Sequence, residues 1–156
     1  MKKEDINLEI FKGFTADQLV ELKTILSSSQ YSAGEVIIRQ NQRADDLFIV
    51  ISGEVEIHHR PYDGPVLSVG KISSGGVFGW SAILGRKDYS STVTAIQSCV
   101  LYRINGRKLQ GFCEHHHETG VVLLEKMALS VAQQPAQIHE QIMKILQFAM
   151  ECPNNN

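Results

Sequence analysis

The alternation of hydrophobic and polar positions divides this chain into three stretches of different texture. Near the N-terminus, four apolar side chains recur at helical spacing and predict one buried helix face: Leu19, Leu22, Ile25 and Leu26. Thr15, with Gln18 three residues later, has the pattern of a capping box, and Phe14 before it can pack onto Leu19. We therefore expect residues 1–27 to form a helical segment that packs on a larger body.

The middle of the chain, residues 28–105, consists of short apolar runs interrupted by glycines. Val55 and Ile57 alternate with polar neighbours, and Gly53 precedes that run as a turn residue would. The runs predict strands at residues 35–39, 46–52, 54–60, 66–72, 77–79, 91–95 and 99–104. Many short strands at this spacing favour a mainly β fold, either a sandwich or a closed jelly roll.

The last third, residues 106–152, becomes helical again. Residues 107–116 predict a short helix, and an apolar stripe from Val121 to Val131 predicts a second one. Pro135 lacks an N–H group and restricts Gln134, so it should kink or end that helix. A further stripe follows at Ile138, Ile142, Ile145, Leu146 and Ala149. The three stretches together have the length of a single domain.

Composition excludes several classes of protein. The 156 residues carry 15 basic and 17 acidic side chains, which gives no clustered positive charge for nucleic acid. The longest apolar run, residues 47–51, is too short to span a membrane, and the start has no signal-peptide pattern. Three cysteines without framework spacing are typical of a reducing compartment, which predicts a cytoplasmic location.

Two segments carry a resemblance to a known family. The first segment covers residues 33–57, AGEVIIRQNQRADDLFIVISGEVEI, and is similar to the leading half of cyclic nucleotide-binding domains. The second covers residues 77–95, VFGWSAILGRKDYSSTVTA, and is similar to the phosphate-binding cassette of the same domains. Gly34, Gly53 and Gly79 fall where that family turns its roll, and such corners often need a positive φ. The resemblance implies a double-stranded β-helix jelly roll, related to the cupins, with flanking helices.

The cassette departs from the family pattern at its charged positions. Trp80 stands where the family has a glutamate that holds the ribose, Asp88 stands at a proline, and Tyr89 stands at the arginine that neutralises the phosphate. An indole offers only a donor and a phenol carries no charge, so cyclic-nucleotide affinity should fall at least about ten-fold. The candidate ligand-binding residues are those of the cassette frame: Phe78, Gly79, Trp80, Ser81, Ala82, Arg86, Tyr89, Ser90 and Ser91.

Three functional hypotheses follow. The first is a stand-alone regulatory or sensor domain of a bacterial type, which responds to another ligand or to a regulated protein. The second is a true cyclic AMP or cyclic GMP receptor in which Arg86 or Lys87 replaces the missing arginine. The third is a ligand-free interaction module, in which Trp80 fills the vacated pocket instead of forming the lid or floor of a ligand site. The identity of any cofactor stays open.

Catalytic and metal chemistry are not expected. Cys113 with His116 or His117 has helical ligand spacing, but a closed zinc site needs four ligands. His58 and His59 are adjacent, so on a strand they face opposite sides and cannot form a cupin-type metal site together. No nucleophile–base motif appears, so we predict a protein that is not an enzyme and has no metal site.

The resemblance also bears on partners. In related regulators the helix after the roll pairs with its twin, so the 121–131 stripe predicts a homodimer seam. Only about twenty residues follow Pro135, too few for a DNA-recognition unit, so DNA binding by this chain alone is not expected. No membrane partner is expected either.

Overall fold

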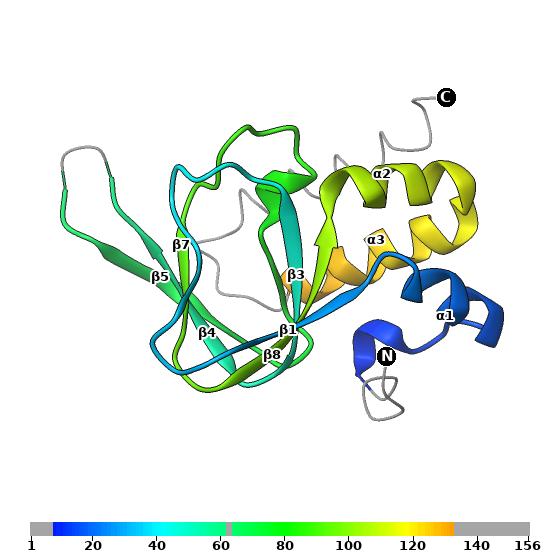
Figure 1. Ribbon diagram of the computed structural model, residues 1–156, viewed down its shortest axis with the longest axis horizontal. Helices are drawn as coiled ribbons and strands as arrows, with labels where there is room; N and C mark the ends of the chain where they lie inside the picture. The colour runs from blue at the N-terminus through cyan, green and yellow to red at the C-terminus, as the bar shows by residue number, and fades with distance from the viewer. Residues whose placement is uncertain (1–7, 62–63, 133–156) are drawn as a thin grey trace.

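The computed structural model describes residues 8–61 and 64–132, and these residues form a β-roll with helices gathered on one side (Figure 1). The chain begins with the short helix η2 (Glu9–Phe11) and helix α1 (Ala16–Lys23). It ends, within the described part, with α2 (Gly106–His115) and α3 (His117–Ala132). Between them run the strands β1 (Ser27–Tyr31), β2 (Val36–Ile38), β3 (Asp46–Ser52), β4 (Glu54–His59), β5 (Leu67–Ser73), β6 (Val77–Phe78), β7 (Thr92–Ala95) and β8 (Cys99–Asn105), with the short helix η3 (Trp80–Ala82) after β6.

The strands of the described residues form two four-stranded antiparallel sheets. One has the order β1-β8-β3-β6 and the other the order β2-β7-β4-β5, so every sheet mixes strands from distant parts of the sequence. This arrangement confirms the expected mainly β jelly roll with flanking helices. The glycine corners are confirmed as well, because Gly34, Gly53 and Gly79 have φ values of 91°, 90° and 87°.

Two hydrophobic cores share the first sheet. We call the cluster between the two sheets the roll core; it contains Phe48, Val50, Phe78, Tyr89 and Leu101, among others. The helix-side core lies between the other face of the first sheet and the helices, and contains Leu47, Ile49, Trp80, Phe112 and Leu123, among others. Because β3 is covered on both faces, its sequence DLFIVIS is a continuous apolar run instead of an alternating one.

Helices α2 and α3 lie where the sequence predicts them, but α1 ends at Lys23, so Ile25 and Leu26 pack into the helix-side core from beyond the helix instead of lying on its face. The capping box at α1 is present: Thr15 Oγ1 accepts from the Gln18 N–H, and Gln18 Oε1 accepts from the Thr15 N–H. The side chain of Glu21 on α1 accepts a hydrogen bond from the Thr119 hydroxyl at 2.8 Å, which ties α1 to α3. The expected kink at Pro135 and the stripe from Ile138 to Ala149 lie outside the described residues.

Strand β1 is the element that the sequence pattern misses. Its residues, SSSQY, are mostly exposed or half-buried, and β1 pairs only with β8 at the edge of its sheet. An edge strand with so little apolar content gives no periodic signal. Its pairing depends on β8, which is about seventy residues away in the sequence (Tyr31 pairs with Cys99 and Ser27 with Arg103) and approaches it only in the folded protein.

Candidate ligand-binding site

The cassette is formed by the end of β6, the helix η3, an exposed loop and the start of β7. Gly79 links β6 to η3 in the left-handed conformation, and a Cβ there would lie 2.8 Å from the Asp46 carbonyl oxygen. Only glycine fits such a close approach without a shift of the backbone. The frame of the cassette is thus built as the sequence suggests.

Three N–H groups at the end of η3 and just after it are occupied within the turn itself. The Ala82 N–H donates to the Gly79 carbonyl at 3.1 Å, and the amides of Ile83 and Leu84 both donate to the Trp80 carbonyl. Binding of an anion at a helix N-terminus requires amides that are free to point at it. This short 3₁₀ turn therefore offers fewer donors than a full helix start.

Tyr89, at the position of the family's arginine, points into the roll core. Its side chain is 4% exposed, and its hydroxyl donates to the Asp46 carbonyl at 2.6 Å and accepts from the Asp46 N–H at 3.0 Å. Strand β6 pairs with Phe48 and Ile49 of β3 but ends before it reaches Asp46. The phenol therefore takes the place of a missing strand neighbour at the edge of β3, a structural task that needs no ligand.

Burial sets the acidity of this phenol. It is the largest of the causes that raise the pKa of Tyr89 from 10.0 to about 12. The hydrogen bond from the Asp46 backbone opposes the shift, and the nearby carboxylates of Asp46 and Asp45 add to it. Tyr89 is accordingly a neutral hydrogen-bonding group at physiological pH and contributes no charge to the cassette.

Trp80, at the position of the family's glutamate, lies in the helix-side core. It is 7% exposed and belongs to the same cluster as Leu109, Phe112 and Leu123 of the helices. Trp80 and Tyr89 thus belong to different cores, and the structure does not bring them together around one space.

The remaining cassette residues are arranged unevenly. Phe78 and Ser81 are buried, whereas Ala82, Ser90 and Ser91 are half-buried. Arg86 and Lys87 are exposed on the loop, and no ion pair joins either side chain to another residue in the described part of the chain. Sequence reasoning singled these residues out together, but the structure gathers no cation and acceptor pair around a common centre among them.

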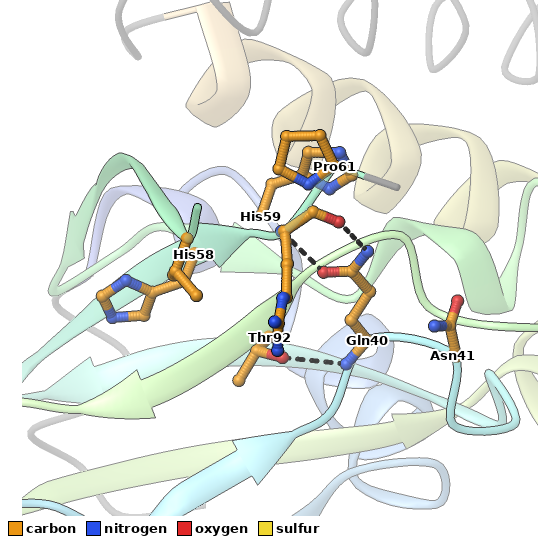
Figure 2. Close-up of a pocket in the computed structure, with 8 residues that line it drawn as sticks. Gln40, Asn41, His58, His59, Pro61 and Thr92 are labelled. Atoms are coloured by element: carbon orange, nitrogen blue, oxygen red, sulfur yellow. Dashed lines mark hydrogen bonds between the residues drawn. The ribbon is translucent and has the colours of Figure 1, made fainter. Parts of the chain in front are cut away.

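A pocket of about 840 Å³ lies beside the cassette instead, and we call it the β4-end pocket (Figure 2). It is lined by residues from four segments of the roll: Gln40, Asn41, His58, His59, Arg60, Pro61, Val66 and Thr92. Sequence reasoning missed Gln40, Arg60 and Thr92 as site residues and considered the two histidines only as metal ligands. The sequence contains one usable signal, the basic cluster His58-His59-Arg60 at the end of a predicted strand.

Metal binding gains no support from the geometry. In residues 8–61 and 64–132, no group of three or more histidine, cysteine, aspartate or glutamate side chains is placed to hold a metal ion. His116 instead lies 3.4 Å from Glu21 and packs against the Phe112 ring.

Comparison with known proteins identifies the family. The model of the cyclic nucleotide-binding domain matches residues 28–116, which is more than half of the chain. The chain belongs to the cyclic nucleotide-binding domain family. A solved Geobacter metallireducens structure, described as cyclic nucleotide-binding, has a TM-score of 0.67 at 26% identity and covers 80% of this chain and 90% of its own.

In the curated relatives the matching segment is a small part of a longer chain. Potassium channel AKT2 of Oryza sativa is 28% identical over 116 residues, which is 74% of this chain but 14% of the channel. The cAMP-dependent protein kinase regulatory subunit of Mycosarcoma maydis is 30% identical over 90 residues, 58% of this chain and 17% of that protein. The match therefore spans less than a quarter of these relatives, and it concerns the regulatory domain alone. No helix in the described part of this chain is long and apolar enough to cross a membrane.

Proposed function

We propose that this chain is a regulatory domain of the family whose cassette does not hold a cyclic nucleotide in the usual way, and which signals through another ligand or a protein partner. The observation that carries the proposal is the place of Tyr89, whose hydroxyl is committed to both backbone groups of Asp46. A side chain used in this way cannot neutralise a cyclic phosphate, and a bidentate arginine contact is among the stronger hydrogen-bonded pairs in proteins.

Restoring affinity through a substitute cation is the main alternative. Arg86 and Lys87 are exposed, so either side chain would have to leave water and fold back toward η3 to reach a bound phosphate. An exposed charge loses solvation and rotamer entropy when it is fixed in this way, which offsets part of any gain. The ribose acceptor would still be absent, because Trp80 is buried in the helix-side core.

Titration calorimetry with cyclic AMP and with cyclic GMP tests the proposal directly. We expect no saturable binding, and no thermal stabilisation when either nucleotide is added at millimolar concentration. A ligand present at a hundred times its Kd stabilises a protein by about 2.7 kcal/mol, which here corresponds to a rise in Tm of about 5–10 °C. Micromolar binding of either nucleotide would overturn the proposal, and its loss in an Arg86→Ala, Lys87→Ala double variant would assign the binding to the substitute cations.

A ligand-free interaction module is a weaker candidate. The tight packing of Trp80 favours it, but the β4-end pocket is an open cavity of the size that small-molecule sites have, which counts against it. We also propose that the domain is not itself an enzyme, in keeping with the regulatory character of its family.

Association through α3 completes the proposed mode of action. Leu124 and Ala128 of the predicted 121–131 stripe are buried in the helix-side core of the same chain, so a seam on α3 would have to use Leu129, which is 66% exposed, and the half-buried Val121 and Val122. We propose a homodimer through this helix, acting on a regulated protein and not on DNA or a membrane. Sedimentation analysis of the full chain beside a Leu129→Glu variant tests it, since a dimer should become a monomer in the variant.

Two further expectations belong to the same proposal. Cys99 and Cys113 are both buried and neither forms a disulfide bond, which suits a reducing cytoplasm. Residues 1–27, 28–105 and 106–152 are proposed to fold as one unit, because α1 and the C-terminal helices share the helix-side core with β3. A single cooperative transition, seen by both far-ultraviolet circular dichroism and Trp80 fluorescence, would be the corresponding observation.

A further inference from the structure

The β4-end pocket has the size of a ligand site and lies beside the cassette, with which it shares Thr92. Its volume of about 840 Å³ falls within the range of roughly 300–1,000 Å³ that small-molecule sites have. It is lined by the loop after β2, the end of β4, the entry to β5 and the start of β7. None of the cassette positions Trp80, Arg86 or Tyr89 lines it, so the pocket poses a separate question of what it binds.

The frame of the pocket is held by hydrogen bonds that cross from one segment to another (Figure 2). The Gln40 side chain donates to the Arg60 carbonyl at 2.8 Å and accepts from the Arg60 N–H at 2.8 Å. The Gln40 N–H in turn donates to the Thr92 hydroxyl at 2.9 Å. Arg60 lies one residue beyond β4, so the amide of Gln40 continues the pairing where the strand ends. These bonds fix the Gln40 side chain and the Arg60 backbone, whereas the exposed side chains of Arg60 and Asn41 would still be ordered on binding.

Three side-chain groups of the pocket are left available once the frame is made. His59 Nδ1 lies 2.9 Å from the Ser90 carbonyl oxygen, which can only accept, so Nδ1 carries a proton; in the tautomer with this single ring proton Nε2 is an acceptor, and no described residue bonds to it. Among the described residues, neither the Arg60 guanidinium nor the Asn41 amide has a hydrogen-bond or ion-pair partner. Asn41 has a left-handed backbone with φ of 71°, and its N–H donates to the Tyr89 carbonyl at 2.9 Å, while its side chain is exposed.

The charge of the lining favours an anion. Arg60 contributes a permanent positive charge, and no described carboxylate lines the pocket. The nearest acidic partner on β4, Glu56, is 3.5 Å from His58 Nε2, and Figure 2 shows the His58 ring turned away from Gln40 and Thr92. Pro61 and the 58% exposed Val66 add an apolar wall. An arginine fork beside an apolar wall suits an organic molecule that bears a phosphate or carboxylate group.

We propose that the β4-end pocket binds a small organic oxyanion, with Arg60 as its counter-ion and with His59 Nε2 and the Asn41 amide orienting its polar groups. The expected ligand carries a hydroxyl or N–H group that donates to His59 as well as its oxyanion. This inference deepens the proposed function, because it names the class of ligand that a regulatory domain without a working cassette would sense. Binding in the pocket does not depend on the proposed function; only the regulatory role of that binding rests on it.

Titrations of the full chain, followed by amide NMR shifts, test the proposal with three probes: inorganic phosphate, ribose 5-phosphate and malate. Saturable shifts at Gln40, Asn41, Arg60 and Thr92 are expected with at least one organic probe, and the comparison of ribose 5-phosphate with malate distinguishes a phosphate from a carboxylate ligand. Arg60→Ala leaves the backbone bonds to Gln40 in place and should weaken binding at least about ten-fold, because it removes the charged donors. Arg107→Ala, which removes an exposed arginine of α2 outside the pocket, is the matched control and should bind as the parent chain does.

A second variant separates the hydrogen bonding of the site from its charge. His59→Asn retains a donor near the Ser90 carbonyl but removes Nε2, so ribose 5-phosphate should bind several-fold more weakly while inorganic phosphate changes little. Absence of saturable binding with all three probes, or equal losses in Arg60→Ala and Arg107→Ala, overturns the inference and leaves the proposed function intact. Cyclic AMP that shifts the cassette residues and loses affinity in Arg86→Ala overturns the proposed function and leaves the pocket assignment intact.

Discussion

Removing the hydroxyl of Tyr89 tests whether this residue has a structural role in place of the family's phosphate-binding arginine. In a Tyr89→Phe variant the ring stays in the roll core, but the N–H and the carbonyl of Asp46 both lose their partner. A buried backbone group without a partner costs about 1–3 kcal/mol, and Asp46 is half-buried, so water replaces part of the loss. We expect a loss of about 2 kcal/mol in the free energy of unfolding, or about 4–8 °C in Tm.

Urea denaturation of the parent chain and the variant measures that difference. Tyr31→Phe is the matched control, because Tyr31 packs against the same roll core and its hydroxyl has no hydrogen-bond partner among the described residues. The control should stay within about 0.5 kcal/mol of the parent chain. Equal stabilities for the two variants would refute the structural role of the Tyr89 hydroxyl, and would reopen the possibility that it is available to a ligand.

Three further predictions follow from the same region. The pKa of Tyr89 is raised from 10.0 to about 12, so its contribution to stability is fully present below pH 10. Between pH 10 and 12 the free energy of unfolding should fall by about 2–3 kcal/mol, because the unfolded chain loses the phenol proton first. Urea titrations at several pH values should show this decline in the parent chain and not in Tyr89→Phe. Gly79→Ala should lower the Tm more than Gly75→Ala does in thermal melts. Both glycines have φ near 88°, but only a Cβ at Gly79 would meet Asp46. Equal falls in Tm would argue that backbone strain alone matters. Trp80→Glu, which restores the family's residue, should cost at least about 3 kcal/mol by denaturation because it places a carboxylate in the helix-side core, whereas Trp80→Phe should cost clearly less.

Local signals were sufficient for most of the fold. The capping box of Thr15 and Gln18 depends on contacts within one turn, and the structure confirms it. Strand β3 was predicted with the bounds it has, since its apolar run is continuous. The positive φ values of Gly34, Gly53 and Gly79 were predicted from their place at corners of the roll. The capping box is fixed within one turn, whereas the glycine corners were predicted from the family resemblance and also depend on close approaches by distant residues, such as Asp46 at Gly79 and Ser98 at Gly53.

The candidate site depended on distances that the sequence does not contain. The sequence determined that the cassette lacks its glutamate and arginine, because that is a matter of residue identity at aligned positions. Only the tertiary structure decided that Tyr89 turns inward to Asp46, 43 positions earlier in the chain, and that Trp80 joins the helices. The frame of the β4-end pocket likewise depends on Gln40, which crosses to Arg60 and Thr92 at one end of the second sheet, where β2, β7 and β4 lie side by side. Long-range pairing decides such geometry, and no local pattern of hydrophobic and polar residues can encode it.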